Sequence, residues 1–218
     1  MANELALARM GLRERKKFQT RRRLMATALE LFAERGFDKV SVAEIAEAAE
    51  VSKMTVFNHF AGKEDLVLQP VEEHTRDVAQ ALRDRPPGES AVAAVRRHYL
   101  TAVEERDASI GLDGEPLVVQ LTRLIIETPV LLTRAQAALF QSSELVAEAL
   151  TEETGDPVMA RVAAAQLMGT RATLVHENHR RLLLGDPTEE IARDAELLGR
   201  RAFDLVERGL GDYATRQP

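Results

Sequence analysis

The stretch from Thr20 to Leu66 reads TRRRLMATALELFAERGFDKVSVAEIAEAAEVSKMTVFNHFAGKEDL. Its first apolar residues recur at the spacing of one helical face and stop at Gly36. Such a face is buried against other elements, and glycine favours a helix end. The pattern therefore predicts an amphipathic helix from about Phe18 to Arg35.

Two shorter helices are expected next in the same stretch. Ser41 and Glu44 have the spacing of a capping box, which predicts a second helix ending near Ala49. Ser52 has a side chain suited to cap a third, very short helix through Phe60. Two short helices joined by a tight turn have the dimensions of a helix-turn-helix, whose second helix enters the major groove of DNA.

The third helix is expected to have an inward and an outward side. Val56 and Phe60, with Val51 just before the helix, have the spacing to point back to the apolar residues of the first two helices. The residues left facing outward, which would meet the bases, are Lys53, Met54, Thr55, Phe57 and Asn58.

These features together resemble the DNA-binding domain of the TetR family of bacterial regulators. The residues that carry the resemblance are Thr20-Arg21, Leu31-Phe32, Gly36-Phe37, Ile45-Ala46, Val51-Ser52, Phe57-Asn58-His59-Phe60, Lys63-Glu64 and Leu66. The resemblance implies an arm and helix-turn-helix domain over residues 1–62 and a helical ligand-binding and dimerisation domain over residues 63–218. It further implies a homodimeric repressor that a small-molecule inducer releases from a palindromic operator, with no enzymatic activity and no cofactor.

The resemblance also implies which residues grip phosphates and which read bases. Phosphate contacts would come from Arg21, Arg22, Ser41, Ser52, His59 and Lys63. A basic arm would be completed by Arg13, Arg15, Lys16, Lys17 and Arg23. Bases or thymine methyl groups would be read by Lys53, Met54, Thr55, Phe57 and Asn58.

Two positions depart from the family's pattern. Glu50 stands in the turn where members often have glycine, so this turn is expected to carry some backbone strain. Phe57 stands where members often have tyrosine, and it lacks the hydroxyl that would bond a phosphate. Phe57 is therefore expected to make an apolar contact.

The remainder of the chain also indicates helices, since no strict alternation of apolar and polar residues is present. Long helices are expected to begin at three capping residues followed by proline, at Thr128-Pro129, Asp156-Pro157 and Asp186-Pro187. Others are expected over about residues 63–85, 89–106 and 115–126. The fold class is thus all-α with about nine helices, and the ends, about residues 1–12 and 212–218, are expected to fray.

The boundary between the two domains is expected inside the helix of residues 63–85. Pro70 lies within that helix and cannot donate a hydrogen bond to the carbonyl of Leu66, so a kink is expected there. We hypothesise that this kink sets the angle between the domains.

Composition and charge limit the class of protein. The 218 residues include no cysteine, which excludes disulfides, thiolate zinc sites and cysteine nucleophiles. The chain shows neither a signal-peptide pattern nor an apolar run near the ~20 residues that span a bilayer, so a cytoplasmic protein is expected. Residues 1–66 hold 12 of the 29 Lys and Arg and 10 of the 35 Asp and Glu, a balance of +2 in a chain of net charge −6. The first 66 residues therefore carry a small positive net charge, and the rest of the chain carries a negative one.

A homodimer is expected to pair through the last two helices. Residues 160–172 are rich in alanine and glycine, which permits close helix approach. The last helix has an apolar stripe made of Leu197, Leu198, Ala202, Leu205 and Val206. The spacing alone would equally suit a core within one chain.

A ligand pocket in the body is expected to have aliphatic walls, because aromatic residues are few there. This composition suits a flexible aliphatic or acyl-type inducer. The candidate lining residues, each beside apolar neighbours on an expected helix, are His98, Tyr99, Arg123, Phe140, Gln166, Arg171 and His176. Each polar one could instead be a surface residue or a hydrogen-bonded core group.

Other functions have weaker support. His176 and His179 share a helical face but do not have the spacing of a zinc protease motif, and no metal is expected. No nucleophile elbow, phosphate-binding loop or dinucleotide fingerprint is present in the sequence. The alternative is a helical ligand-binding or enzymatic protein whose basic N-terminal head serves another contact.

Overall fold

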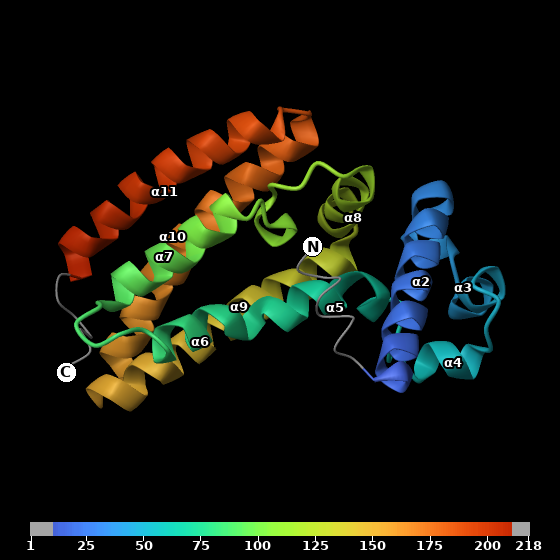
Figure 1. Ribbon diagram of the computed structural model, residues 1–218, viewed down its shortest axis with the longest axis horizontal. Helices are drawn as coiled ribbons and strands as arrows, with labels where there is room; N and C mark the ends of the chain where they lie inside the picture. Colours follow the sequence, from blue (N-terminus) through green and yellow to red (C-terminus); the bar gives the residue numbers. More distant parts are fainter. Residues whose placement is uncertain (1–10, 211–218) are drawn as a thin grey trace.

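The computed structural model describes residues 11–210, and its regular structure over that range is helical throughout (Figure 1). Ten α-helices and three short 3-10 helices are present within these residues. The all-α prediction is confirmed, and the expected nine helices become ten because one of them is divided. The expected fraying of the ends concerns residues that lie mostly outside the described range.

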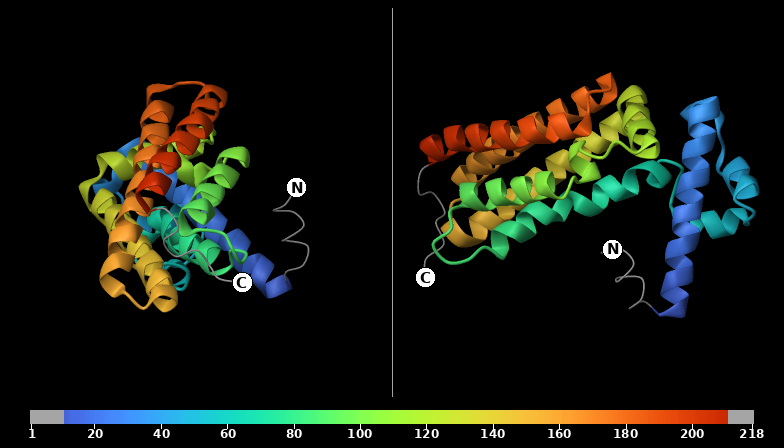
Figure 2. Two further views of the ribbon diagram at one scale, coloured as in Figure 1. Left: turned by 90° about the vertical axis from the view of Figure 1, so that its left-hand side faces the viewer. Right: turned by 45° about the horizontal axis from the view of Figure 1, so that its top comes forward.

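The N-terminal unit consists of α2 (Leu12–Arg35), η1 (Phe37–Lys39), α3 (Val42–Ala48) and α4 (Lys53–Phe57). The predicted start of the first helix near Phe18 is wrong by about six residues. The preceding segment of Arg, Glu and Lys holds good helix formers and no helix breaker, so the helix extends back to Gly11. Figure 2 shows α2 lying across one end of the body, with α3 and α4 on the far side of it.

The connecting segment forms α5 (Asp65–Glu73), η2 (His74–Arg76) and α6 (Asp77–Arg83) instead of one helix. The helix continues through residue 70 and breaks four residues later. At the break the Thr75 hydroxyl donates to the Glu72 carbonyl at 2.8 Å, a local bond that competes with the helical ladder. The α-helix is therefore interrupted by a 3-10 turn at residues 74–76.

The remaining helices form the body. They are α7 (Ala91–Glu104), η3 (Ala108–Ile110), α8 (Pro116–Glu127), α9 (Pro129–Thr154), α10 (Pro157–Leu184) and α11 (Thr188–Leu210). α10 packs along both α9 and α11, and α11 packs along α7. No single helix in the described range is long and apolar enough to cross a bilayer; α8 and α9 meet those limits only as a pair, bent by 95° at their junction.

The three long helices that were predicted to begin at a capping residue followed by proline differ in whether that residue makes a cap bond. Asp156 caps α10, since its carboxylate accepts hydrogen bonds from the backbone N–H groups of Val158 and Met159, each at 3.1 Å. Thr128 makes no side-chain cap bond. The Asp186 carboxylate instead accepts a bond from Nε of Arg181 at 2.6 Å. The helix starts were therefore predictable, whereas two of the three caps were not.

Two apolar clusters form the cores of the molecule. One joins α2, α3 and α4 with the start of α5, and Leu131 of α9 belongs to it. The other joins α6, α7, α9, α10 and α11. An ion pair links the two regions, because Arg134 of α9 donates to Asp65 of α5 at 2.7 Å and also to Glu72. The N-terminal unit is thus fixed to the body through α5, α8 and α9.

Candidate nucleic-acid interface

The turn between α3 and α4 has the geometry of a helix end closed by a left-handed residue. The backbone N–H of Val51 donates to the Ala46 carbonyl at 2.9 Å, and Glu50 has φ 52°. Few non-glycine residues adopt this conformation. The strain expected at Glu50 is confirmed, and the turn sends the chain directly into α4.

Both predicted serine caps are confirmed. The hydroxyl of Ser41 accepts from the Glu44 backbone N–H at 3.3 Å, and the Glu44 carboxylate accepts from the Ser41 backbone N–H at 2.8 Å. The carboxylate also accepts from the Ser41 hydroxyl at 2.7 Å, and the bonds it accepts from the Ser41 backbone and hydroxyl and from Arg35 lower the pKa of Glu44 to about 2. The hydroxyl of Ser52 accepts from the Thr55 backbone N–H at 3.0 Å. The caps position both short helices.

The two sides of α4 separate as predicted. Val56 is 1% exposed and Phe60, just after the helix, is 3% exposed. Met54 and Phe57 are 68% and 49% exposed. Lys53 and Asn58 are also exposed, while Thr55 is partly buried. An exposed methionine and phenylalanine on so short a helix form an apolar surface that is available for contact.

Basic residues of α2 lie beside the end of α4. Arg21 holds its guanidinium 5.7 Å from the ring centre of Phe60. The pKa of His59 is lowered by burial first, and then by the positive charges of Lys17 and Arg21. Lys17 and Arg21 of α2 therefore place positive charge beside the end of α4, of the kind that attracts phosphates.

Lys63, a predicted phosphate contact, has neighbours within the protein. Its Nζ donates to the carbonyls of Phe37 at 2.9 Å and Val40 at 3.4 Å, and lies 4.3 Å from the Phe37 ring centre. An ammonium group has three donors, so one proton stays available. In this structure Lys63 ties the start of α5 to η1.

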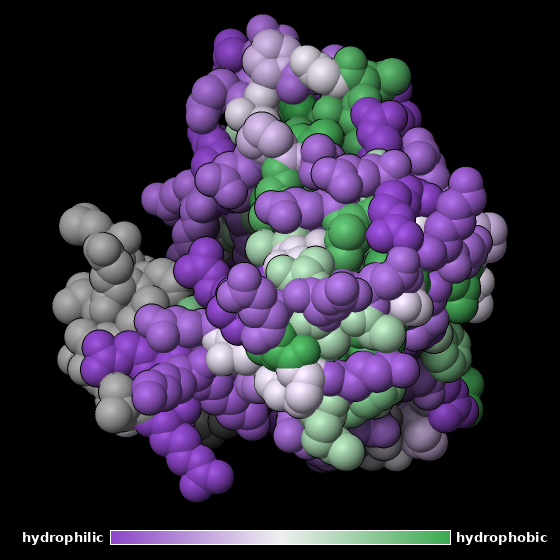
Figure 3. All heavy atoms as spheres, turned by 90° about the vertical axis from the view of Figure 1, so that its right-hand side faces the viewer, coloured by the Kyte–Doolittle hydropathy of each residue, from purple (hydrophilic) through white to green (hydrophobic). Residues whose placement is uncertain are grey.

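Figure 3 shows the end of the molecule that the N-terminal helices form. Hydrophilic side chains cover most of it, with hydrophobic ones between them. Charged groups beside apolar ones suit a surface that meets both phosphates and bases.

Residues 24–69, which hold this arrangement, match the family described as bacterial regulatory proteins, tetR family. The N-terminal unit of this chain is a tetR-family domain. TcmR of Streptomyces glaucescens, an HTH-type transcriptional regulator, is 40% identical over 124 residues, which are 56% of this chain and 54% of TcmR. LuxR of Vibrio harveyi, also an HTH-type transcriptional regulator, is 44% identical over 64 residues, 29% of this chain and 31% of LuxR. The chain thus spans about half of TcmR and a third of LuxR.

Solved structures share the fold of the whole chain. NalD of Pseudomonas aeruginosa superposes with a TM-score of 0.58 at 23% identity, over 85% of this chain and 96% of NalD. GusR of Salmonella enterica gives a TM-score of 0.55 at 18% identity, over 87% of this chain and 94% of GusR. The likeness extends through the body as well as the N-terminal unit.

In the body, the structure brings some of the candidate ligand residues together. His98 and Tyr99 of α7 and Arg171 of α10 are close enough to influence one another's pKa. Phe140 of α9 is 68% exposed and lines a small cavity together with Arg171. The other three, which are exposed and do not join this group, are Arg123, Gln166 and His176.

Asn178 of α10 is a buried polar residue that the sequence reasoning missed. Its Nδ2 donates to the Ile110 carbonyl at 3.0 Å and to the Tyr99 hydroxyl at 3.4 Å. The available signal was its spacing of four from both Leu174 and Leu182, which are buried on the same face. Asn178 fixes η3 and α7 against α10.

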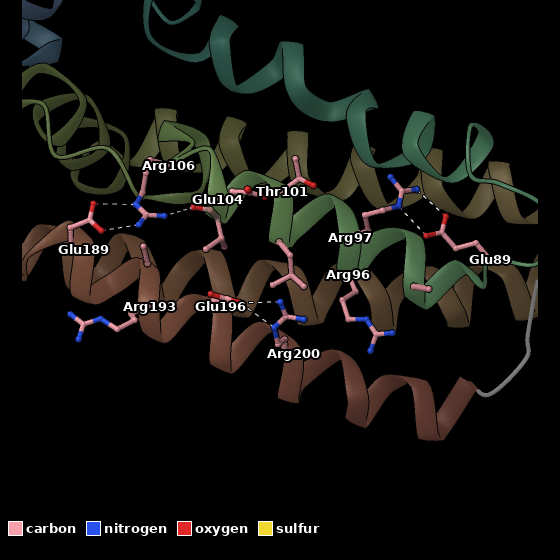
Figure 4. A pocket seen from close by; sticks show the side chains of 14 residues that line it. Glu89, Arg96, Arg97, Thr101, Glu104, Arg106, Glu189, Arg193, Glu196 and Arg200 are labelled. Atoms are coloured by element: carbon pink, nitrogen blue, oxygen red, sulfur yellow. Dashed lines mark hydrogen bonds and ion pairs between the residues drawn. The ribbon is translucent and has the colours of Figure 1, made fainter.

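A larger groove of about 900 Å³ runs between α7 and α11 (Figure 4). Its charged side chains largely pair with one another, as in Arg97–Glu89 at 2.9 Å and Arg106–Glu189 at 2.8 Å. A lining of exposed, mutually neutralised charges does not suit an aliphatic ligand.

The two histidines considered for a metal lie in different surroundings. His176 is exposed, whereas burial, and after it the charge of His176, lowers the pKa of His179 to about 4. Within residues 11–210 no group of three or more His, Asp or Glu is placed to hold a metal ion.

Proposed function

We propose that this chain is a homodimeric transcriptional regulator that binds a palindromic DNA operator and is released by a small molecule. The observation that carries the proposal is the exposed side of α4 beside the basic turns of α2. A helix so presented fits the major groove, while cations next to it fit the phosphates. Such a regulator acts in the cytoplasm, where bacterial DNA lies.

We propose the following roles for the residues that are predicted to contact DNA. Lys53 and Asn58 read base edges, and Met54 and Phe57 contact thymine methyl groups. Thr55, partly buried, reaches the groove with its hydroxyl. Phosphates are held by Arg21, Arg22, Ser41, Ser52, His59 and the third proton of Lys63.

The homodimer forms through α10 and α11. The small residues of α10 divide between two surfaces: Ala160, Ala163 and Ala164 are buried in the chain's own core, whereas Ala165 and Gly169 are exposed. On α11, Val206 packs inward, while Leu197, Leu198 and Leu205 are exposed. An exposed apolar side on two adjacent long helices supports pairing with a second copy. Sedimentation of the full chain is expected to give a dimer.

We propose repression by analogy with NalD, a protein of the same fold that is the secondary repressor of a multidrug efflux pump in Pseudomonas aeruginosa. Release requires that the ligand bind more tightly to a dimer geometry in which the two α4 helices no longer match the groove spacing. The aliphatic side chains of the body support an apolar or acyl-type ligand.

A gel-shift assay with the chain's own upstream DNA at physiological salt tests the proposal. We expect sequence-selective binding that weakens steeply as salt rises. Asn58→Ala is expected to cost about 1–3 kcal/mol and relax specificity at one base position, whereas Lys53→Ala lowers affinity. Arg200→Ala, an exposed change in the body, is the matched control and leaves affinity unchanged.

The opposite results would favour another function. Binding without sequence preference, or no binding at all, would support a helical ligand-binding or enzymatic protein whose basic head serves another contact. Equal affinity of the Asn58→Ala and wild-type chains for every operator variant would remove α4 from base reading.

A further inference from the structure

Arg171 of α10 is a partly buried cation that makes no hydrogen bond through its buried Nε–H. Its Nε atom is buried and has no partner, and the described residues offer its guanidinium no hydrogen bond or ion pair. Burial lowers the pKa of Arg171, and the more distant Asp107, Tyr99 and Asp77 only partly oppose this effect. A guanidinium stays charged even so, and a buried N–H donor without a partner is costly.

Arg85 is a buried arginine with a structural role, and it differs from Arg171 in its hydrogen bonds. Arg85 is 3% exposed, and its guanidinium donates to the Glu153 carboxylate at 2.6 Å, the Leu82 carbonyl at 2.7 Å and the Glu89 carbonyl at 3.0 Å. Arg171 lacks every bond of this kind. The contrast indicates that the partner of Arg171 comes from outside the chain.

A second unused donor lies near Arg171. Nδ1 of His98 on α7 is buried without a hydrogen-bond partner. Burial, and after it the charge of Arg171, lowers the pKa of His98, so its neutral ring has one N–H to donate.

The acids near this pair are already engaged with other groups. The Asp77 carboxylate accepts a hydrogen bond from Nδ1 of His74 at 2.7 Å. The Asp107 carboxylate accepts one from the Ser109 backbone N–H at 2.7 Å. Neither of them bonds Arg171 or His98.

Arg171 also lines a cavity of about 190 Å³ between α9 and α10. The other walls are mainly apolar and include Leu139, Phe140, Met168 and Ala172. Apolar walls with one charged group that fixes orientation are the usual composition of a site for a small organic acid. The volume is below the ~300–1,000 Å³ typical of sites for drug-sized ligands, which favours a compact molecule.

We propose that Arg171 binds the carboxylate of a small apolar acid, whose hydrocarbon part lies against Leu139, Phe140 and Met168. The proposal rests on the ligand-responsive regulator proposed above and names the chemical class of its ligand. The fork of N–H groups on arginine matches a carboxylate in a bidentate geometry. Binding would supply the hydrogen bonds that the folded chain leaves unmade.

Calorimetric titration of the full-length protein with straight-chain saturated carboxylates of four to twelve carbons tests the proposal. We expect at least one acid to bind, with an affinity at least tenfold higher than that of its primary amide. Arg171→Met is expected to weaken that binding at least tenfold, and Arg171→Lys, which keeps the charge but loses the fork, to weaken it less. Arg180→Met, on the same helix and with an exposed ion pair to Glu177, is the control and keeps the wild-type affinity.

A melting experiment without ligand separates a binding role from a structural role. Because Arg171 has no structural partner, Arg171→Met is expected to melt at the same temperature or higher. A lower melting temperature, or binding of every acid in the series equally by wild type and Arg171→Met, would overturn the proposal. So would equal binding of acids and amides, or saturation by chloride or phosphate alone. None of these titrations contains DNA. A failed titration therefore does not affect the gel-shift result, and the titrations can still be interpreted if the gel shift fails.

Discussion

The N-terminal unit and the body differ in how they satisfy their polar groups. In the N-terminal unit, Ser41 and Ser52 close short local bonds three residues along the chain. In the body, the partners lie far apart along the chain, as where Asn178 donates to the Ile110 carbonyl and the Tyr99 hydroxyl. Buried nitrogens without a partner occur in both regions, at His59 beside α4 and at His98 and Arg171 in the body. The surface proposed to meet DNA is therefore shaped by local bonds, whereas the proposed ligand site depends on helices that are distant in the sequence.

The largest effect on stability is expected from a substitution that opens a cavity in one of the two apolar clusters and leaves the other unchanged. Phe32 is 2% exposed and its ring centre lies 4.9 Å from that of Phe37. Phe32→Ala is expected to destabilise the N-terminal unit by about 3–5 kcal/mol, because it leaves a cavity in a well-packed cluster. Hydrogen exchange should show lost protection in α2 and α3 while α10 keeps its protection.

Phe57→Ala provides the matched control, since Phe57 is an exposed aromatic residue of the same unit. We expect its urea unfolding to match that of the wild type while operator affinity falls. Equal loss of protection in α10 after Phe32→Ala would mean that the two cores unfold as one, and the contrast between the regions would not hold.

The sequence predicted the N-terminal unit better than the body, for physical reasons. The caps at Ser41 and Ser52 and the buried side of α4 depend on residues three or four apart, so spacing alone reveals them. The 3-10 turn at residues 74–76, where the Thr75 hydroxyl donates to the Glu72 carbonyl, is not signalled by any periodicity in the sequence. His98 and Arg171 are 73 positions apart in the sequence, and only the folded chain brings them close enough for the charge of Arg171 to lower the pKa of His98. Local rules therefore predict the proposed DNA-binding surface but not the proposed ligand site.

A smaller effect is expected at the turn of the helix-turn-helix. Glu50 has φ 52°, a conformation that costs an L-residue roughly 1–2 kcal/mol and glycine almost nothing. Glycine loses more entropy on folding, so Glu50→Gly is expected to stabilise the chain by about 0.5–1 kcal/mol net. Urea unfolding measures the change. Ala49→Gly, one residue earlier with φ −84°, is the control and is expected to destabilise.

The smallest effect is expected from the capping box at acid pH. Because hydrogen bonds from Ser41 and Arg35 lower the pKa of Glu44 from 4.5 to about 2, the ionised carboxylate stabilises the folded state. This contribution is fully present above about pH 5 and is lost as the pH falls toward 2. Glu44 faces solvent, so screening keeps the effect small. Melting curves from pH 6 to pH 2 should show the difference between wild type and Glu44→Gln shrinking as the pH falls. Glu47→Gln, an exposed change on the same helix, should show no such trend; a pH-independent difference for Glu44→Gln would mean that the cap depends on shape and not on charge.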